Sequence, residues 1–229
     1  MSEDCVSCRG VERTYQQDAV PVRALRGIDF EMDSGAFVSL SGPSGSGKST
    51  LLNIIGGLDR PDQGEVIVAG QALNELSNSA LADLRLRKLG FVFQAYNLVP
   101  VLSAQENVEF ILQLQGVAAA ERAERAHAML QRLGLEGMEH RRPGELSGGQ
   151  QQRVAVARAL VTEPAVLLAD EPSANLDSTT TEELLMLLQD LNENHGVTIL
   201  TATHDPLVIK YAKRRISMRD GQITDDTTG

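Results

Sequence analysis

Long apolar runs are absent from this 229-residue sequence. No stretch approaches the roughly 18 to 20 apolar residues that a helix needs to cross a bilayer. The N-terminal MSEDCVSCRG also lacks the basic flank and the apolar centre of a secretory signal peptide. We therefore expect the chain to stay in the cytoplasm, without direct membrane insertion.

The sequence also has fewer basic than acidic residues. Lys and Arg number 21 against 31 Asp and Glu, a net charge of −10. Because such a surface repels nucleic acid and anionic lipid, we predict no nucleic-acid partner, and attachment to a membrane only through another protein. Hydrophobic residues make up 42% and charged residues 23%, as in ordinary globular proteins. A chain of this length is expected to form one domain, residues 1–229.

Cysteine is limited to Cys5 and Cys8, which form a CxxC pattern. A structural zinc site normally needs four ligands, and the sequence has no second cysteine pair. If the segment is a strand, side-chain alternation places the two thiols on opposite faces. We interpret both as small buried or frayed residues rather than as a metal or redox site.

Short apolar segments alternate with helical patterns along the chain. Strands are predicted to about Val11 and at Ala24–Met32, Ala36–Leu40, Glu65–Ala69, Leu89–Phe93, Ala165–Ala169 and Val197–Thr201. Helical character is predicted at Lys48–Gly57, Val101–Leu135 and Thr179–Asn194. This alternation predicts a parallel sheet covered on both faces. Residues 1–94 and 164–229, approximately, form the α/β frame, and residues 95–163 a helical insertion.

The motif GPSGSGKS, followed by a threonine, satisfies G-x-x-x-x-G-K-[ST] between a predicted strand and a predicted helix. Its residues are Gly42, Pro43, Ser44, Gly45, Ser46, Gly47, Lys48, Ser49 and Thr50. The glycines allow turns that aim backbone N–H groups inward, and the helix N-terminus adds partial positive charge. We expect Lys48 to reach the β- and γ-phosphates and Ser49 to ligate Mg²⁺. The motif therefore predicts a nucleoside triphosphate site.

The stretch AVLLADEP ends an apolar strand with two carboxylates. The end of a parallel strand is where an α/β sheet binds ligand. Asp170 is expected to hold Mg²⁺, and Glu171 to polarise an attacking water as general base. Two such acids are also common as a helix N-cap and a solvated neighbour. Together with GPSGSGKS, the catalytic interpretation is preferred.

These two motifs alone fit a kinase, a GTPase, a helicase or a recombinase-like ATPase. LSGGQ narrows the choice, because Ser147, Gly148, Gly149 and Gln150 stand at the start of a helix. A hydroxyl and two glycine N–H groups at a helix start predict a second anion site. Each chain has one GPSGSGKS loop, so we infer that LSGGQ serves a nucleotide bound to another copy.

With these motifs in this order, nearly the whole chain resembles the nucleotide-binding subunit of ABC transporters. The resemblance implies an α/β P-loop NTPase fold: a RecA-like parallel-sheet core, an N-terminal antiparallel β subdomain and an inserted α-helical subdomain that carries LSGGQ. It also implies an ATPase that forms a homodimer around two ATP with Mg²⁺.

The resemblance assigns four further residues. Gln94 in GFVFQAYN matches a glutamine that contacts Mg²⁺ or the attacking water and responds to the membrane partner. His204 in TATHDP matches a histidine that touches the γ-phosphate, and Asp177 in SANLD an aspartate that crosses to the other subunit. Tyr15 in VERTYQ matches the aromatic that stacks on adenine. Without the resemblance, His204 would be interpreted as a loop histidine with no special role, and Tyr15 as a half-buried residue of a strand.

Within the family, GPSGSGKSTLLNIIGGLDRPDQGEV and LGFVFQAYNLVPVLSAQENVE are most similar to the group of lipoprotein-release (LolD-type) and macrolide-export (MacB-type) ATPases. SANLD replaces the group's more common TGNLD, and TATHD the more common VTHD, with the polar contacts kept. The resemblance implies an FtsX-like permease as partner, attachment to the inner face of the plasma membrane through it, and export or release of lipoprotein, macrolide, peptide or lipid. The chain ends without a membrane segment, so a separate permease chain is expected.

Two other functions stay open at this point. One is a soluble ABC-type ATPase, such as an iron–sulfur assembly ATPase. The other is a regulatory module that binds nucleotide without hydrolysing it. The presence of Lys48, Asp170, Glu171 and His204 argues against the second.

Overall fold

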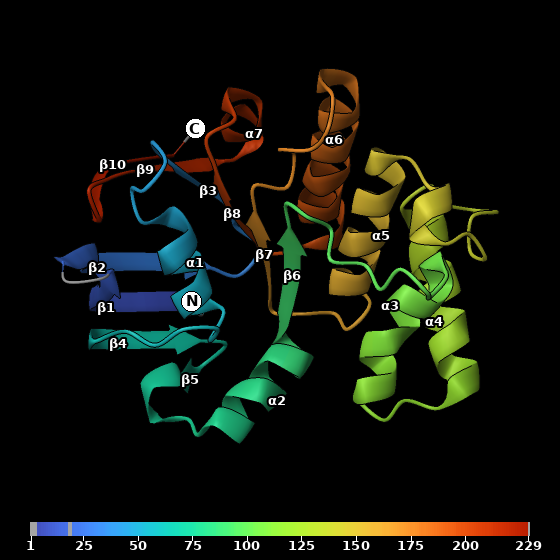
Figure 1. The fold of residues 1–229 in the computed structure, drawn as a ribbon, viewed down its shortest axis with the longest axis horizontal. Helices are drawn as coiled ribbons and strands as arrows, with labels where there is room; N and C mark the ends of the chain where they lie inside the picture. The colour runs from blue at the N-terminus through green and yellow to red at the C-terminus, as the bar shows by residue number, and fades with distance from the viewer. Residues whose placement is uncertain (1–3, 18–19, 229) are drawn as a thin grey trace.

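Two β-sheets organise the chain in the computed structural model, which describes residues 4–17 and 20–228 (Figure 1). The four-stranded antiparallel sheet has the strand order β2-β1-β4-β5. Its strands are β1 (Asp4–Gln17), β2 (Val20–Asp33), β4 (Gln63–Val68) and β5 (Gln71–Ala72). This sheet is the antiparallel subdomain that the family resemblance implies.

The second sheet has six strands in the order β10-β9-β3-β8-β7-β6. They are β3 (Phe37–Ser41), β6 (Leu89–Phe93), β7 (Val166–Asp170), β8 (Ile199–Thr203), β9 (Arg214–Arg219) and β10 (Gln222–Thr228). All neighbouring pairs are parallel except β9 and β10. The carboxyl ends of β3, β6, β7 and β8 therefore meet at one edge, where a parallel sheet binds ligand.

Seven α-helices and two short 3₁₀-helices, Leu73–Glu75 and Pro143–Glu145, complete the described part of the chain. The α-helices are α1 (Lys48–Ile55), α2 (Asn78–Lys88), α3 (Ala104–Leu114), α4 (Ala119–Arg132), α5 (Gly148–Leu160), α6 (Ser178–His195) and α7 (Pro206–Tyr211). In Figure 1, α3, α4 and α5 group at one end of the molecule and the antiparallel sheet lies at the other, with β6 and β7 between them. Among residues 4–17 and 20–228, no helix has the length and apolar character that crossing a membrane requires.

Side-chain alternation along the parallel strands divides the interior into two cores. Val38, Leu168 and Leu200 pack with α1 against the antiparallel sheet. Their neighbours Phe37, Leu167 and Ile199 pack on the opposite face with α3 to α6. Successive residues of a strand point to opposite faces, so a strand buried on both faces is apolar throughout. The predicted doubly covered parallel sheet is therefore confirmed.

Several elements differ from the sequence prediction. β1 continues beyond Val11 to Gln17, because it pairs with β2 along a long hairpin. Residues 78–88, for which the sequence analysis predicts no helix, form α2. Ser77 caps this helix by accepting a hydrogen bond from the Ala80 N–H at 3.2 Å, and the last turn carries basic residues. Both features favour a helix.

Both cysteines are free and buried, with exposed fractions of 4% for Cys5 and 1% for Cys8. The Cys5 thiol donates to the Ala165 carbonyl at 3.3 Å, and burial raises the pKa of Cys8 to about 12. A thiol with a raised pKa is a poor nucleophile. Within the described ranges, no three His, Cys, Asp or Glu side chains are grouped closely enough to hold a metal ion. The two cysteines therefore contribute packing to the core between the sheets.

Candidate active site

The loop from Gly42 to Gly47 joins β3 to α1 and is enclosed by two other strands. Gly42, Gly45 and Gly47 have φ angles of 146°, 77° and 102°. A Cβ at Gly42 would collide with the Met218 carbonyl of β9, and one at Gly47 would lie 2.6 Å from the Ala24 carbonyl of β2. Only glycine fits both the backbone conformation and the space. The loop is therefore held in a set of tight turns, one of them closed by the Ser46 N–H, which donates to the Pro43 carbonyl at 3.2 Å.

Lys48 begins α1 and is 7% exposed. Its ammonium donates to the carbonyls of Gly42 and Pro43 at 2.8 and 3.0 Å. The positive charge thus lies directly over the loop that precedes it.

The side-chain oxygens of Ser49 and Asp170 lie next to each other and are of the kind that divalent cations bind. The Ser49 hydroxyl donates to Asp170 Oδ1 at 3.0 Å. Burial, reinforced by the nearby charge of Glu171, raises the pKa of Asp170, while the Ser49 hydrogen bond and Lys48 oppose the rise. Carboxylate and hydroxyl oxygens are what Mg²⁺ prefers, and a divalent cation would favour the ionised carboxylate. The residues present therefore fit Mg²⁺.

Glu171 follows β7 in a left-handed conformation, with φ at 47°. Its N–H donates to the Ala202 carbonyl of β8 at 2.8 Å. Its carboxylate accepts from the Thr203 hydroxyl at 3.2 Å and lies 2.7 Å from His204 Nδ1. A non-glycine residue in this conformation costs of order 1–3 kcal/mol, and such strain clusters at functional sites. Neither Asp170 nor Glu171 caps a helix, so that alternative is wrong here.

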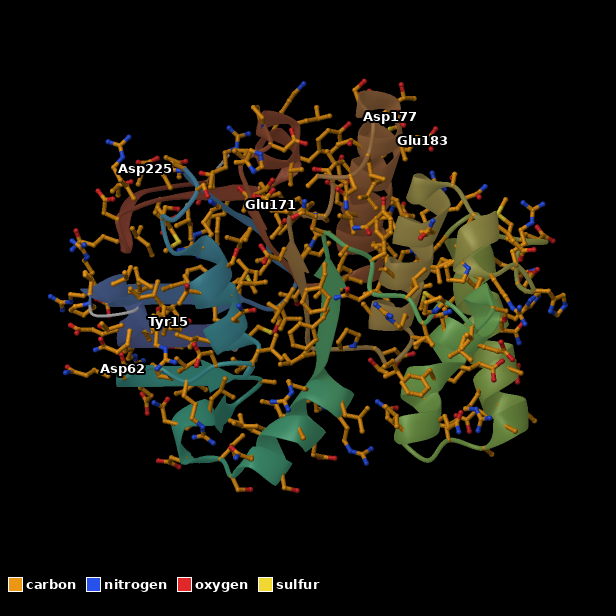
Figure 2. The ribbon with its side chains drawn as sticks, viewed as in Figure 1. Tyr15, Asp62, Glu171, Asp177, Glu183 and Asp225 are labelled. Atoms are coloured by element: carbon orange, nitrogen blue, oxygen red, sulfur yellow. The ribbon has the colours of Figure 1, made fainter. Side chains whose placement is uncertain are left out.

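A cavity of about 810 Å³ opens above these groups. Of the predicted site residues, it is lined by Tyr15, Pro43, Ser44, Gly45, Ser46, Gly47, Lys48, Ser49, Thr50, Gln94, Glu171 and His204. Five other residues, which no sequence motif singles out, also line the cavity: Val22, Arg23, Ala24, Arg26 and Asp220. In Figure 2, Glu171 lies between Tyr15 on the antiparallel sheet and Asp177 at the start of α6. The tertiary structure therefore gathers phosphate-loop, carboxylate and aromatic groups around one space.

LSGGQ lies outside this cavity lining, at the start of α5. Ser147 Oγ accepts from the Gln150 N–H at 3.3 Å, and Gln150 Oε1 accepts from the Ser147 N–H at 2.9 Å. This capping box satisfies two N–H groups of the helix start. A Cβ at Gly149 would collide with the Thr180 methyl of α6, and one at Gly148 would lie 3.0 Å from the Tyr96 hydroxyl. The glycines thus have a packing role within one chain.

Asp177 lies outside the cavity lining as well and caps α6. Its carboxylate accepts from the Thr180 N–H at 3.0 Å and from the Thr180 hydroxyl at 2.8 Å. The backbone hydrogen bond lowers the pKa of Asp177. An ionised carboxylate at a helix N-terminus is favoured by both the bond and the helix dipole.

The segment after Gln94 is tied to two other elements. The Gln94 carbonyl accepts from Asn175 Nδ2 at 2.8 Å. Tyr96 and Asn97 have positive φ angles, and their carbonyls accept from the Arg158 guanidinium of α5 at 2.8 and 2.5 Å. Burial lowers the pKa of Arg158. The sequence offered no signal for these contacts, because the partners are 61 to 81 residues apart.

Comparison with known proteins identifies this arrangement. The model of the family described as ABC transporter matches residues 25–174, which hold the phosphate loop, LSGGQ and Glu171. The chain belongs to the ABC transporter family. Its ATPase fold and the corresponding ATP-hydrolysing activity, expected from the motifs, are thereby confirmed.

Relatives of this ABC ATPase support the subgroup as well. The chain is 47% identical over 98% of its length to a protein named macrolide export ATP-binding/permease protein MacB from Syntrophobacter fumaroxidans, and covers 32% of that protein. It is 48% identical to an uncharacterized ABC transporter ATP-binding protein from Thermotoga maritima, with 93% of this chain and 91% of that protein covered. The chain therefore spans about a third of the MacB relative. These names do not favour the soluble alternative.

A solved structure superimposes closely on this ABC ATPase. It is described as the dimeric structure of a post-hydrolysis state of the ATP-binding cassette MJ0796 bound to ADP and Pi. The TM-score is 0.89 at 43% sequence identity, with 97% of this chain and 98% of that chain covered. The fold around the cavity is thus the same as in a cassette seen with products of ATP hydrolysis.

Proposed function

We propose that two copies of this ABC ATPase close around two ATP molecules and use the hydrolysis of ATP to drive an FtsX-like permease. The observation that carries the proposal is the division of the motifs. The cavity gathers the phosphate loop, Glu171 and His204, whereas the LSGGQ residues and Asp177 lie outside its lining. A complete site then needs the second half from another chain.

Within one chain, the residues have separable tasks. The loop N–H groups bind the phosphates, and Lys48 exchanges the carbonyls of Gly42 and Pro43 for phosphate oxygens. Glu171 accepts a proton from the attacking water, and His204 and Gln94 orient that water and the γ-phosphate. Ser49, Asp170 and Gln94 would hold Mg²⁺, and the ion would supply positive charge against the charge that develops on the phosphate. Tyr15 stacks on the base.

Between chains, the start of α5 completes the partner's site. Ser147, Gly148, Gly149 and Gln150 present a helix N-terminus to the γ-phosphate that the partner holds, and Asp177 crosses the interface beside them. The dimeric structure of MJ0796 supports this assembly. Contacts made only in the closed dimer let ATP binding close it and hydrolysis reopen it.

The permease is proposed to dock in a second cavity of about 580 Å³ between α2, β6 and α3. Apolar residues line it, among them Leu86, Phe93 and Ile111, and its rim includes Leu58 and Leu114, which are exposed. Arg158 lines it too and binds the carbonyls beside Gln94. A cytoplasmic segment of the permease seated here would thus touch the residue that holds the Gln94 loop.

The remaining parts of the proposal follow from the relatives. The MacB relatives are ATP-binding/permease proteins of which this chain matches about a third, so a permease partner is proposed as well. The chain would then lie on the inner face of the plasma membrane, held there by the permease. Export or release of a macrolide, lipoprotein, peptide or lipid is the proposed task.

Glu171→Gln tests the catalytic core of the proposal. The change keeps the shape of the side chain and removes the base, so ATP should bind, turnover should fall nearly to zero, and a dimer should accumulate. Size-exclusion chromatography with and without Mg·ATP measures the dimer, and phosphate release measures turnover. A variant that hydrolyses ATP normally, or stays monomeric with ATP bound, overturns the proposal.

A further inference from the structure

Tyr15 is held in place by a group that the nucleotide motifs do not include. Its hydroxyl donates to Asp59 Oδ2 at 2.6 Å. The Arg13 guanidinium carbon lies 4.7 Å from the centroid of the Tyr15 ring, within cation–π distance. Although the side chain is 37% exposed, both its hydroxyl and one ring face are therefore occupied.

Arg13 is fixed in turn by two carboxylates. Its Nε and Nη2 donate to the two oxygens of Asp59 at 3.0 and 2.8 Å, and its Nη1 donates to Asp62 Oδ1 at 2.7 Å. Asp62 also accepts from the Thr14 N–H at 2.6 Å, and Figure 2 labels it close to Tyr15. A bidentate guanidinium–carboxylate pair has a defined geometry, which a single lysine charge would not reproduce.

Tyr15 and the two residues that hold it line different hollows. Tyr15 lines the nucleotide cavity. Arg13 and Asp59 line a different hollow of about 420 Å³, and among the described residues neither of them lines the nucleotide cavity. Arg13 thus lies behind the ring and leaves the cavity face free for a base.

The anchor comes from the same chain segment as the phosphate loop. α1 starts at Lys48 and ends at Ile55, and Asp59 and Asp62 follow in the segment that leads to β4. The segment from residue 42 to residue 62 therefore contacts both the phosphate end of the cavity and, through Asp59, its aromatic end.

We propose that Asp59 and Arg13 are positioning residues that hold the Tyr15 ring in its stacking orientation before nucleotide binds. This inference rests on the proposed role of Tyr15 as the base platform. A side chain that is ordered beforehand loses no rotamer freedom when ligand binds, so the anchor strengthens binding of ligands that carry a base. Ligands without a base do not use the platform, and their binding should not depend on Asp59.

The test compares ADP with inorganic pyrophosphate, both with Mg²⁺, by direct and competitive isothermal titration calorimetry. Asp59→Ala should raise the Kd for ADP about two- to tenfold, the cost of ordering one side chain. Tyr15→Ala should raise it about five- to 150-fold, the range for loss of one stacking contact. Tyr15→Phe, which keeps the ring and removes only the anchored hydroxyl, should resemble Asp59→Ala. Pyrophosphate binding should be unchanged in all three.

Steady-state ATP hydrolysis adds a second readout, since Asp59→Ala should raise KM and leave kcat unchanged. If Asp59→Ala yields little folded protein, Tyr15→Phe takes its place, because it removes the same hydrogen bond and leaves Asp59 paired with Arg13. An equal loss of ADP and pyrophosphate affinity, or no loss at all, overturns the positioning role. If Tyr15→Ala weakens ADP binding but Asp59→Ala does not, the positioning role alone is wrong. If Tyr15→Ala has no effect, the role of Tyr15 itself is wrong.

Discussion

Replacing Gly149 by alanine tests why two glycines stand at the start of α5. The added Cβ would collide with the Thr180 methyl, and Thr180 is held because its hydroxyl donates to Asp177 at 2.8 Å. A β-branched side chain tied in this way has no other favourable rotamer close by. Overpacking costs about 1–3 kcal/mol. In the opposite direction, alanine is favoured over glycine within a helix by up to about 1 kcal/mol. We expect Gly149→Ala to lower the free energy of unfolding by about 1–2 kcal/mol.

Thr180→Ser is the matched partner for this change. Serine keeps the hydroxyl that binds Asp177 and removes the methyl that a Cβ at Gly149 would meet. The double variant should therefore be at least as stable as Thr180→Ser alone. Urea unfolding of the four proteins measures the coupling energy, which we expect to be about 1–2 kcal/mol. A coupling below about 0.5 kcal/mol refutes the packing argument, because that is the scatter of independent sites.

The same four proteins separate packing from function. If Gly149 must also let the partner's γ-phosphate approach, the double variant should regain stability without regaining ATP hydrolysis. Phosphate release at saturating Mg·ATP measures this, with Thr180→Ser as the control for any effect of the methyl alone. Recovery of both stability and hydrolysis would contradict the proposed intermolecular role of Gly149.

Two further predictions concern partly buried polar groups. Arg158→Ala removes the guanidinium that donates to the carbonyls of Tyr96 and Asn97. We expect the free energy of unfolding in urea to fall by about 1–3 kcal/mol and hydrogen exchange at residues 94–97 to become faster, with Arg158→Lys intermediate. Unchanged exchange would contradict this prediction. Burial raises the folded pKa of Asp170 above its unfolded value, so its ionisation costs stability that increases as pH rises through that window. Asp170→Asn should therefore raise the urea midpoint at pH 7 in the absence of Mg²⁺ and lose this advantage at acid pH; an equal or lower midpoint at pH 7 contradicts the desolvation argument.

Much of the fold was predictable because its signals are local. Strands that are buried on both faces of a sheet appear in the sequence as apolar runs. The predicted bounds of β3, β7 and β8 therefore lie within two residues of the observed ones. α2 was missed because its helical signals, the Ser77 cap and the basic last turn, lie in a sequence of low apolar content. β10 is mostly polar and exposed, and it is held by contacts such as that of Arg214 with Asp226 rather than by an apolar pattern.

The residues of the candidate site also fall into those that a short motif identifies and those that long-range contacts bring in. Gly42–Ser49 and Asp170–Glu171 were identifiable because one short segment carries each function. Thr203, Arg158 and Asp59 were not, because each acts on a residue 32 to 62 positions away in the chain. A polar residue acquires such a role only through the neighbour that folding brings to it.

The sequence by itself determined the class of this protein and showed its GPSGSGKS loop, its carboxylate pair and its LSGGQ motif. Those are properties of contiguous residues whose backbone geometry is set locally. Only the tertiary structure decided that Glu171 is held by Thr203 and His204, that Tyr15 is backed by Arg13 and Asp59, and that Gly149 packs against Thr180. The physical reason is that hydrogen bonds and close packing depend on distances in space, and strands and helices distant in sequence supply the partners.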